Sequence, residues 1–240
     1  MMQFRGLPTI LSKRFFNGMR FISSSSRKEK SFRKMYQEFW TPKAINKPPY
    51  DHFTQIGDPV LRTKASKVPE DLITSKEVKV IAEKMVKVLK KFDCVGVAAP
   101  QIGISLRIIV MEFREGLKEH FSLPVYEARK MSTLPLTVLL NPSMSVTNYQ
   151  KHKHPEGCMS VRGYSAEVER YDSVSLKGTN LDGIEVNIEL SGWNARIAQH
   201  EMDHLDGKLY IDIMDRSTFM CTCWEAVNSK SGRVEIPFYK

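Results

Sequence analysis

Two histidines spaced four residues apart, His200 and His204, place the strongest constraint on how this 240-residue chain can fold. They lie in residues 193–205, where apolar residues recur at helical spacing. On a helix, imidazoles at positions i and i+4 project from one face and can bind the same metal ion. Glu201 lies between them and can reach a water on that metal. The segment therefore predicts a helix that carries a metal site on one face.

Two imidazoles leave a catalytic metal short of its usual three protein ligands. A metzincin protease would place a third histidine six residues after the second, but Tyr210 stands there. A thermolysin-like protease would use a downstream glutamate. Glu225 and Glu235 are available, in segments unlike that family's motif, so a zinc endopeptidase stays open as an alternative. Upstream lies Cys158, and a thiolate with two imidazoles suits a tetrahedral site for zinc or ferrous iron. A lone cysteine is also common as an inert core residue.

A third segment, residues 96–101, begins with small residues that let another backbone approach closely. It ends in Gln101, whose side-chain amide can donate a hydrogen bond. Taken alone, the segment also describes a tight turn before a strand.

Together and in this order, residues 96–101, 156–160 and 200–204 resemble the three signature motifs of the peptide deformylase family. Residues 57–61 resemble an early segment of that family, and the resemblance runs to about Asp212. It implies a metal-dependent hydrolase that removes the formyl group from the N-terminal methionine of newly synthesised proteins and releases formate.

The resemblance also implies which residues carry the chemistry. The metal ligands are Cys158, His200 and His204. The family works best with Fe²⁺, although the same ligands accept Zn²⁺ or Co²⁺ and do not by themselves select the ion.

Catalysis is implied to depend on three further groups. Glu201 takes a proton from water and returns it to the leaving amine. The side-chain amide of Gln101 and the backbone N–H of Met159 stabilise the developing oxyanion.

The family binds its substrate as an extended strand, with a pocket for the methionine side chain. We therefore expect the substrate to contact Val95, Gly96, Val97, Gly157, Trp193 and Ile197. Cys94 departs from the bacterial pattern, which has glycine there, whereas animal-type mitochondrial members tolerate similar residues.

The remaining patterns predict a single α+β domain, with antiparallel strands packed around the central metal-binding helix. A second amphipathic helix is expected over residues 75–92, on another face. Ser191 and Gly207 are expected to begin and end the central helix. Strands are expected at 106–113, 136–140, 143–149, 167–174 and 184–190.

The first 28 residues carry six basic residues, no acidic residue and a run of four serines, which is typical of an organellar transit peptide. Removing those six charges lowers the formal net charge from +9 to +3. We expect a mitochondrial transit peptide at 1–28, a lead-in segment at 29–49, a catalytic domain at 50–240 and residence in the mitochondrial matrix. A basic RNA-binding tail is the alternative for the first segment.

The expected partners are N-formylmethionyl nascent chains and, through them, the mitochondrial ribosome, without direct recognition of nucleic acid. An RNA-associated protein that retains the fold without catalysis is a further alternative. No apolar run approaches the roughly 18 residues of a membrane-spanning helix. The four cysteines lack the spacing of a disulfide scaffold, so Cys221 and Cys223 are expected to be ordinary thiols, and His152 and His154 to be loop residues.

Overall fold

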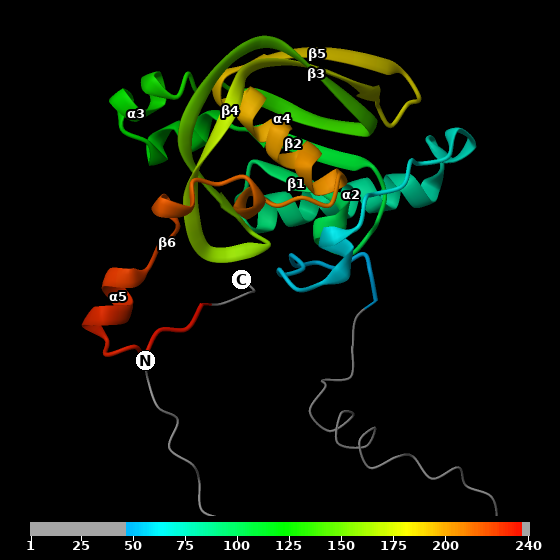
Figure 1. Ribbon diagram of the computed structural model, residues 1–240. Coiled ribbons are helices and arrows are strands. Elements are labelled where there is room, and N and C mark those ends of the chain that lie inside the picture. The colour runs from blue at the N-terminus through cyan, green and yellow to red at the C-terminus, as the bar shows by residue number, and fades with distance from the viewer. Residues whose placement is uncertain (1–46, 237–240) are drawn as a thin grey trace, which may run out of the picture. The chain divides into compact units, whose positions relative to one another are not determined.

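A computed structural model of the chain describes residues 47–236. The expected transit peptide and nearly all of the lead-in segment lie outside these residues. One antiparallel sheet has the strand order β1-β2-β3-β4-β5, and β6 pairs with β4 (Figure 1). No helix in residues 47–236 is long and apolar enough to cross a membrane. The strands are β1 (Gly96–Ala98), β2 (Ile108–Phe113), β3 (Leu134–Cys158), β4 (Val161–Thr179), β5 (Glu185–Ser191) and β6 (Met220–Cys221).

The helices lie before, between and after these strands. The α-helices are α2 (Lys76–Lys91), α3 (Leu123–Ala128), α4 (Gly192–Leu205) and α5 (Trp224–Ser229). Short 3-10 helices span Pro59–Arg62, Glu70–Leu72, Ala99–Ile102, Glu115–His120, Tyr210–Asp212 and Arg216–Thr218. This architecture confirms the α+β class with antiparallel strands around a central helix.

Both long helices begin and end where local sequence signals predict. The side chain of Ser75 accepts a hydrogen bond from the backbone N–H of Val78 at 3.3 Å and caps α2. Ser191 occupies the N-cap position of α4, although its side chain makes no capping hydrogen bond. Gly207 follows the end of α4 with φ of 73°, a left-handed conformation that glycine adopts without steric cost.

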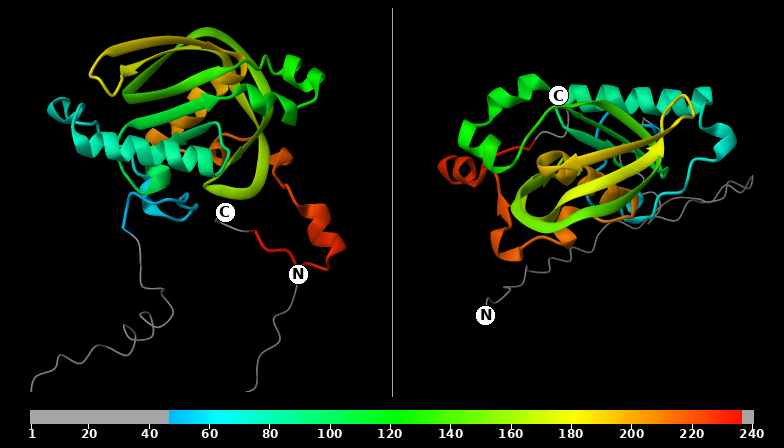
Figure 2. Two further views of the ribbon diagram at one scale, coloured as in Figure 1. Left: turned by 180° about the vertical axis from the view of Figure 1, so that it is seen from behind. Right: turned by 90° about the horizontal axis from the view of Figure 1, so that it is seen from above.

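The two helices cover opposite faces of the first strands (Figure 2). Successive side chains of a strand point to opposite faces. Accordingly, Ile109 and Met111 of β2 pack in a core cluster with residues of α4, whereas Ile108 and Val110 pack with residues of α2. A strand buried on both faces is apolar throughout, which explains the continuous hydrophobic run of β2.

The two strands expected on either side of Asn141-Pro142 are wrong as separate elements, because β3 runs through both residues without interruption. The register with β4 shifts at this point, and Asn141 has a φ of 50°. Its side chain bonds the backbone N–H and C=O of Val68 at 2.8 and 2.9 Å. Pro142 therefore falls in a β-bulge, where its missing N–H removes no ladder hydrogen bond.

Candidate active site

Three side chains that could hold a metal ion converge where the end of β3 meets α4. One ligand atom each from Cys158, His200 and His204 lies within 4.8 Å of the others, and Cys158 Sγ is 3.3 Å from His204 Nε2. Burial raises the pKa of the Cys158 thiol, but the two imidazoles outweigh it and hold the pKa well below its usual value. A thiolate with two imidazoles matches the donor set of a tetrahedral catalytic site with one open position. These residues therefore fit a divalent metal ion.

Glu201 presents a carboxylate beside this cluster. Its side chain is 3% exposed, and burial raises its pKa to about 7 against the opposing effect of the imidazoles. Its Oε2 atom is buried without a hydrogen-bond partner among the described residues. A Cβ atom added at Gly96 would lie 2.7 Å from Glu201 Cδ and closer still to Oε1, so glycine at this position of β1 leaves room for the Glu201 carboxylate. The carboxylate can exchange a proton near neutral pH.

Gln101 lies in the 3-10 helix that follows β1, and its orientation is fixed at both ends. Its Oε1 accepts a hydrogen bond from the Ala98 N–H at 2.9 Å. Its Nε2 therefore faces Cys158 Sγ at 3.5 Å and Ser160 Oγ at 3.3 Å. Met159 lies in the two-residue turn between β3 and β4, directly after Cys158. Both expected oxyanion donors are thus beside the metal ligands.

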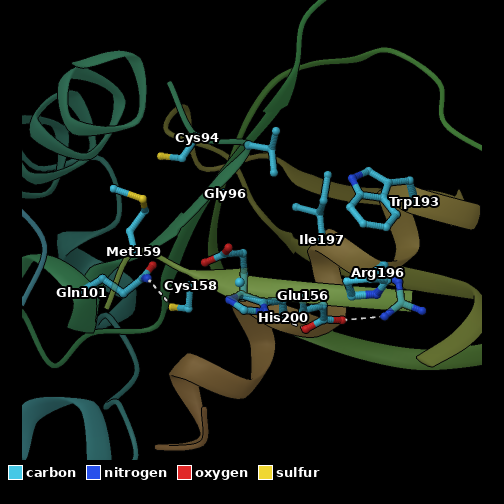
Figure 3. A pocket seen from close by; sticks show the side chains of 14 residues that line it. Cys94, Gly96, Gln101, Glu156, Cys158, Met159, Trp193, Arg196, Ile197 and His200 are labelled. Carbon is cyan, nitrogen blue, oxygen red and sulfur yellow. Dashed lines mark hydrogen bonds and ion pairs between the residues drawn. The ribbon is translucent and has the colours of Figure 1, made fainter. Parts of the chain in front are cut away.

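A cavity of about 150 Å³ opens in front of these groups (Figure 3). Of the six expected substrate contacts, five line it: Val95, Gly96, Gly157, Trp193 and Ile197. The side chain of Val97 instead packs toward α2 in the apolar core. Within the described residues, β1 pairs with β2 alone and is an edge strand of the sheet.

A buried ionic cluster supports His200, and sequence reasoning did not find it. Glu156 Oε2 lies 3.0 Å from His200 Nδ1, and the same carboxylate accepts hydrogen bonds from Arg170 at 2.9 and 3.0 Å and from Arg196 at 2.7 Å. Arg170 also donates to Asp203 at 2.6 Å. Occupation of Nδ1 by this hydrogen bond leaves Nε2 of His200 for a metal, as is usual behind metal-binding histidines.

Part of this cluster had a signal in the sequence. Arg196 precedes His200 by four residues on one helix, so the two share a face. Arg170 has no such signal, because its position depends on the pairing of β4 with β3, where it lies opposite His152.

The structure also places the other histidines and cysteines for which expectations came from the sequence. His152 and His154 are not loop residues, because β3 is continuous through both. His152 Nε2 is 3.2 Å from Asp172 Oδ1. Cys221 and Cys223 are free thiols with Sγ atoms 3.4 Å apart. Cys94 lines the cavity, and burial raises its pKa to about 12.

Comparison with known proteins decides the family. The sequence model of the polypeptide deformylase family matches residues 50–219. The chain belongs to this family. Peptide deformylases are metal-dependent hydrolases that remove the N-formyl group from the methionine at the start of a new protein, and this is the activity of the chain.

Individual peptide deformylases show how far the similarity extends. The human mitochondrial peptide deformylase is 40% identical over 181 residues, 75% of this chain and 74% of the human protein. Peptide deformylase 1A of Arabidopsis thaliana, named chloroplastic/mitochondrial, is 43% identical over 166 residues, 68% of this chain and 61% of its own length.

Solved structures agree with the fold. A peptide deformylase of Acinetobacter baumannii with Met-Ala-Ser bound has a TM-score of 0.60 and 30% identity, covering 68% of this chain and 96% of its own. The Synechococcus elongatus enzyme in complex with actinonin has a TM-score of 0.58 and 30% identity, covering 80% of this chain and 91% of its own.

Proposed function

We propose that this peptide deformylase holds one divalent ion, Fe²⁺ in the cell, on Cys158, His200 and His204. The soft thiolate and the two imidazoles suit ferrous iron, and Zn²⁺ or Co²⁺ can replace it. When bound, the ion supplies the Lewis acidity that lowers the pKa of water and polarises the formyl carbonyl.

Glu201 is the general acid and base of the reaction. The observation that carries this role is a carboxylate that lines the cavity and has a buried oxygen, Oε2, without a hydrogen-bond partner among residues 47–236. The carboxylate takes the proton of the attacking water and returns it to the leaving amine. Its pKa of about 7 lets it hold either state near physiological pH.

The oxyanion that develops on the formyl oxygen is stabilised by two donors from this chain. One is Nε2 of Gln101, held toward the metal ligands because the Ala98 N–H occupies its amide oxygen. The other is the backbone N–H of Met159, one residue after Cys158. Donors fixed before substrate arrives need no reorganisation when charge develops.

The substrate is an N-formylmethionyl peptide that lies as an added strand along β1. Along this edge the substrate contacts Val95, Gly96 and Val97, with the backbone of Gly96 facing away from β2, and Gly157 lies across the cavity. Trp193 and Ile197 provide an apolar wall for the unbranched methionine side chain. The Acinetobacter relative with Met-Ala-Ser bound supports this substrate class.

The enzyme acts in the mitochondrial matrix on chains that leave the mitochondrial ribosome. The basic composition of residues 1–28 and the mitochondrial names of the human and Arabidopsis relatives support this location. Under this proposal the catalytic domain spans 50–240 and follows a lead-in segment at 29–49.

The test is formate release from a formyl-Met-Ala-Ser peptide by the chain, purified without oxygen and loaded with Fe²⁺. Glu201→Gln keeps the shape of the side chain but removes its base. We expect kcat to fall by about 10²- to 10⁴-fold with metal content unchanged. Glu83→Gln, an exposed position on α2, is the matched control. Full turnover by metal-loaded Glu201→Gln would contradict the proposed role of Glu201, and no release by the folded, metal-loaded wild type would contradict the activity.

A further inference from the structure

A short segment before the first helix, residues 53–56, bonds to both turns that carry the oxyanion donors. We call it the N-terminal strap. The Thr54 N–H donates to Gln101 O at 2.8 Å, and the Ile56 N–H donates to Ser160 O at 2.8 Å. Phe53 is 2% exposed and packs edge-on against Phe92 with ring centroids 5.3 Å apart. The strap is therefore anchored in the apolar core and joins two segments far apart in sequence.

Gln55 makes the one side-chain hydrogen bond from the strap to the two-residue turn after Cys158. Its Nε2 donates to Met159 O at 2.9 Å and to Phe53 O at 3.1 Å. Both partners are carbonyl oxygens, so only the amide nitrogen can face them. The two N–H groups of one amide are thus both used, and the side chain is fixed in direction.

The bond to Met159 O acts on a peptide unit that also contacts a proposed metal ligand. The peptide between Met159 and Ser160 has its C=O bonded to Gln55, while its N–H donates to Cys158 Sγ at 3.4 Å. A peptide unit is planar and rigid. Fixing the direction of the C=O therefore fixes the direction in which the Ser160 N–H points.

We propose that Gln55 is a positioning residue of the metal centre, which holds the Met159–Ser160 peptide so that its N–H bonds to the Cys158 thiolate. The hydrogen bond withdraws electron density from the sulfur, so the thiolate donates less electron density to the metal. The metal is then a stronger Lewis acid. Partners behind a metal ligand commonly tune it in this way. The inference rests on the proposed role of Cys158 as a ligand.

The proposal requires residue 55 to have a side-chain N–H donor. Methionine and glutamate match glutamine in length but have no N–H donor, so both should release the peptide. Histidine offers one ring N–H of similar reach and should restore the bond to Met159 O while losing the bond to Phe53 O. Gln150, an exposed glutamine on β3, provides the matched control as Gln150→Met.

The experiment uses the full chain loaded with Co²⁺, whose thiolate-to-metal charge-transfer absorption reports the Cys158–metal bond directly. We expect Gln55→Met and Gln55→Glu to shift this band to longer wavelength, because a thiolate without its N–H donor gives up charge more readily. Gln55→His and Gln150→Met should keep the wild-type band. In parallel, kcat for formyl-Met-Ala-Ser should fall by about 10-fold or more in the first two variants, with KM unchanged.

An unshifted band in folded, Co²⁺-loaded Gln55→Met would overturn the proposal, as would the same shift in Gln55→His. If Gln55→Met does not fold, the comparison of Gln55→Glu with Gln55→His decides by the same criterion. The spectrum does not depend on turnover. A band shift in a chain that releases no formate would therefore support the inference while contradicting the proposed function.

Discussion

Gly96 is the position where one added methyl group should separate catalysis from folding. The β1 backbone passes so close to Glu201 that a Cβ atom there would lie 2.7 Å from Cδ and 3.0 Å from Cγ. Gly96 does not have a positive φ, so alanine brings no backbone strain of its own. The three nearest atoms all belong to the Glu201 side chain, so Gly96→Ala should force that side chain out of its present position.

The size of the loss in kcat/KM depends on whether the β1 backbone or the Glu201 side chain moves. Sheet pairing holds Gly96 opposite Met111, whereas Oε2 of Glu201 has no hydrogen-bond partner among the described residues and can move at low cost. Loss of a positioned general base costs at least about 100-fold in rate. For Gly96→Ala we expect kcat/KM to fall by about that factor, roughly 2.7 kcal/mol of transition-state stabilisation. Alanine is favoured over glycine within a strand by about 0.5–1 kcal/mol, which offsets the cost of moving the Glu201 side chain, so the free energy of unfolding should hardly change.

The assay is steady-state formate release from formyl-Met-Ala-Ser, with metal content and thermal melting measured on the same samples. Gly116→Ala is the control, because a Cβ atom there would meet nothing within 4 Å. Wild-type kcat/KM in a folded, metal-loaded Gly96→Ala variant would refute the argument that β1 places Glu201. A large fall in melting temperature would show that the strand had moved instead of the side chain.

Two further predictions concern other buried groups. Glu156→Gln leaves the buried Arg196 without its carboxylate partner and leaves Arg170 with Asp203 alone, and it should destabilise the fold by about 3–5 kcal/mol in denaturant melts. Burial raises the pKa of Glu156, but hydrogen bonds and charges of His200 and Arg170 together outweigh burial and lower this pKa. The ionised carboxylate therefore stabilises the fold above the usual carboxyl pKa, and this stabilisation is lost as pH falls below about 4.5. Glu156→Gln should therefore flatten the acid side of the stability profile, and an unchanged profile would contradict this. Because burial raises the pKa of Cys94 to about 12, iodoacetamide at pH 8 should alkylate Cys94 more slowly than it does after unfolding; equal rates by mass spectrometry would contradict the burial argument.

The parts of the site that could be predicted from sequence depend on local spacing. His200 and His204 share a face of α4 because they are four residues apart, and the periodicity of residues 75–92 gave α2 almost to the residue. Residues 96–101 and 156–160 could be joined to α4 only through the family resemblance, since their spacing does not place them in space.

The parts that could not be predicted depend on strand register. Arg170 reaches Glu156 because β4 pairs with β3 over a long hairpin interrupted by several bulges. A shift of one residue would turn the Arg170 side chain to the other face of the sheet. The continuity of β3 through Pro142 is likewise set by a bulge and by the contact of Asn141 with Val68, far away in sequence.

Some buried polar residues of α4 hold the helix in place, whereas others face the candidate site. Gln199 exchanges two hydrogen bonds with the backbone of Tyr171 at 2.8 and 3.0 Å, and Arg196 is bonded to Glu156. Their burial is compensated, because nearly all buried polar groups have partners. Glu201 is as deeply buried, yet its Oε2 has no partner within the described residues. The carboxylate can therefore accept a hydrogen bond from water or substrate that enters the cavity, and the burial that raises its pKa makes it a stronger base.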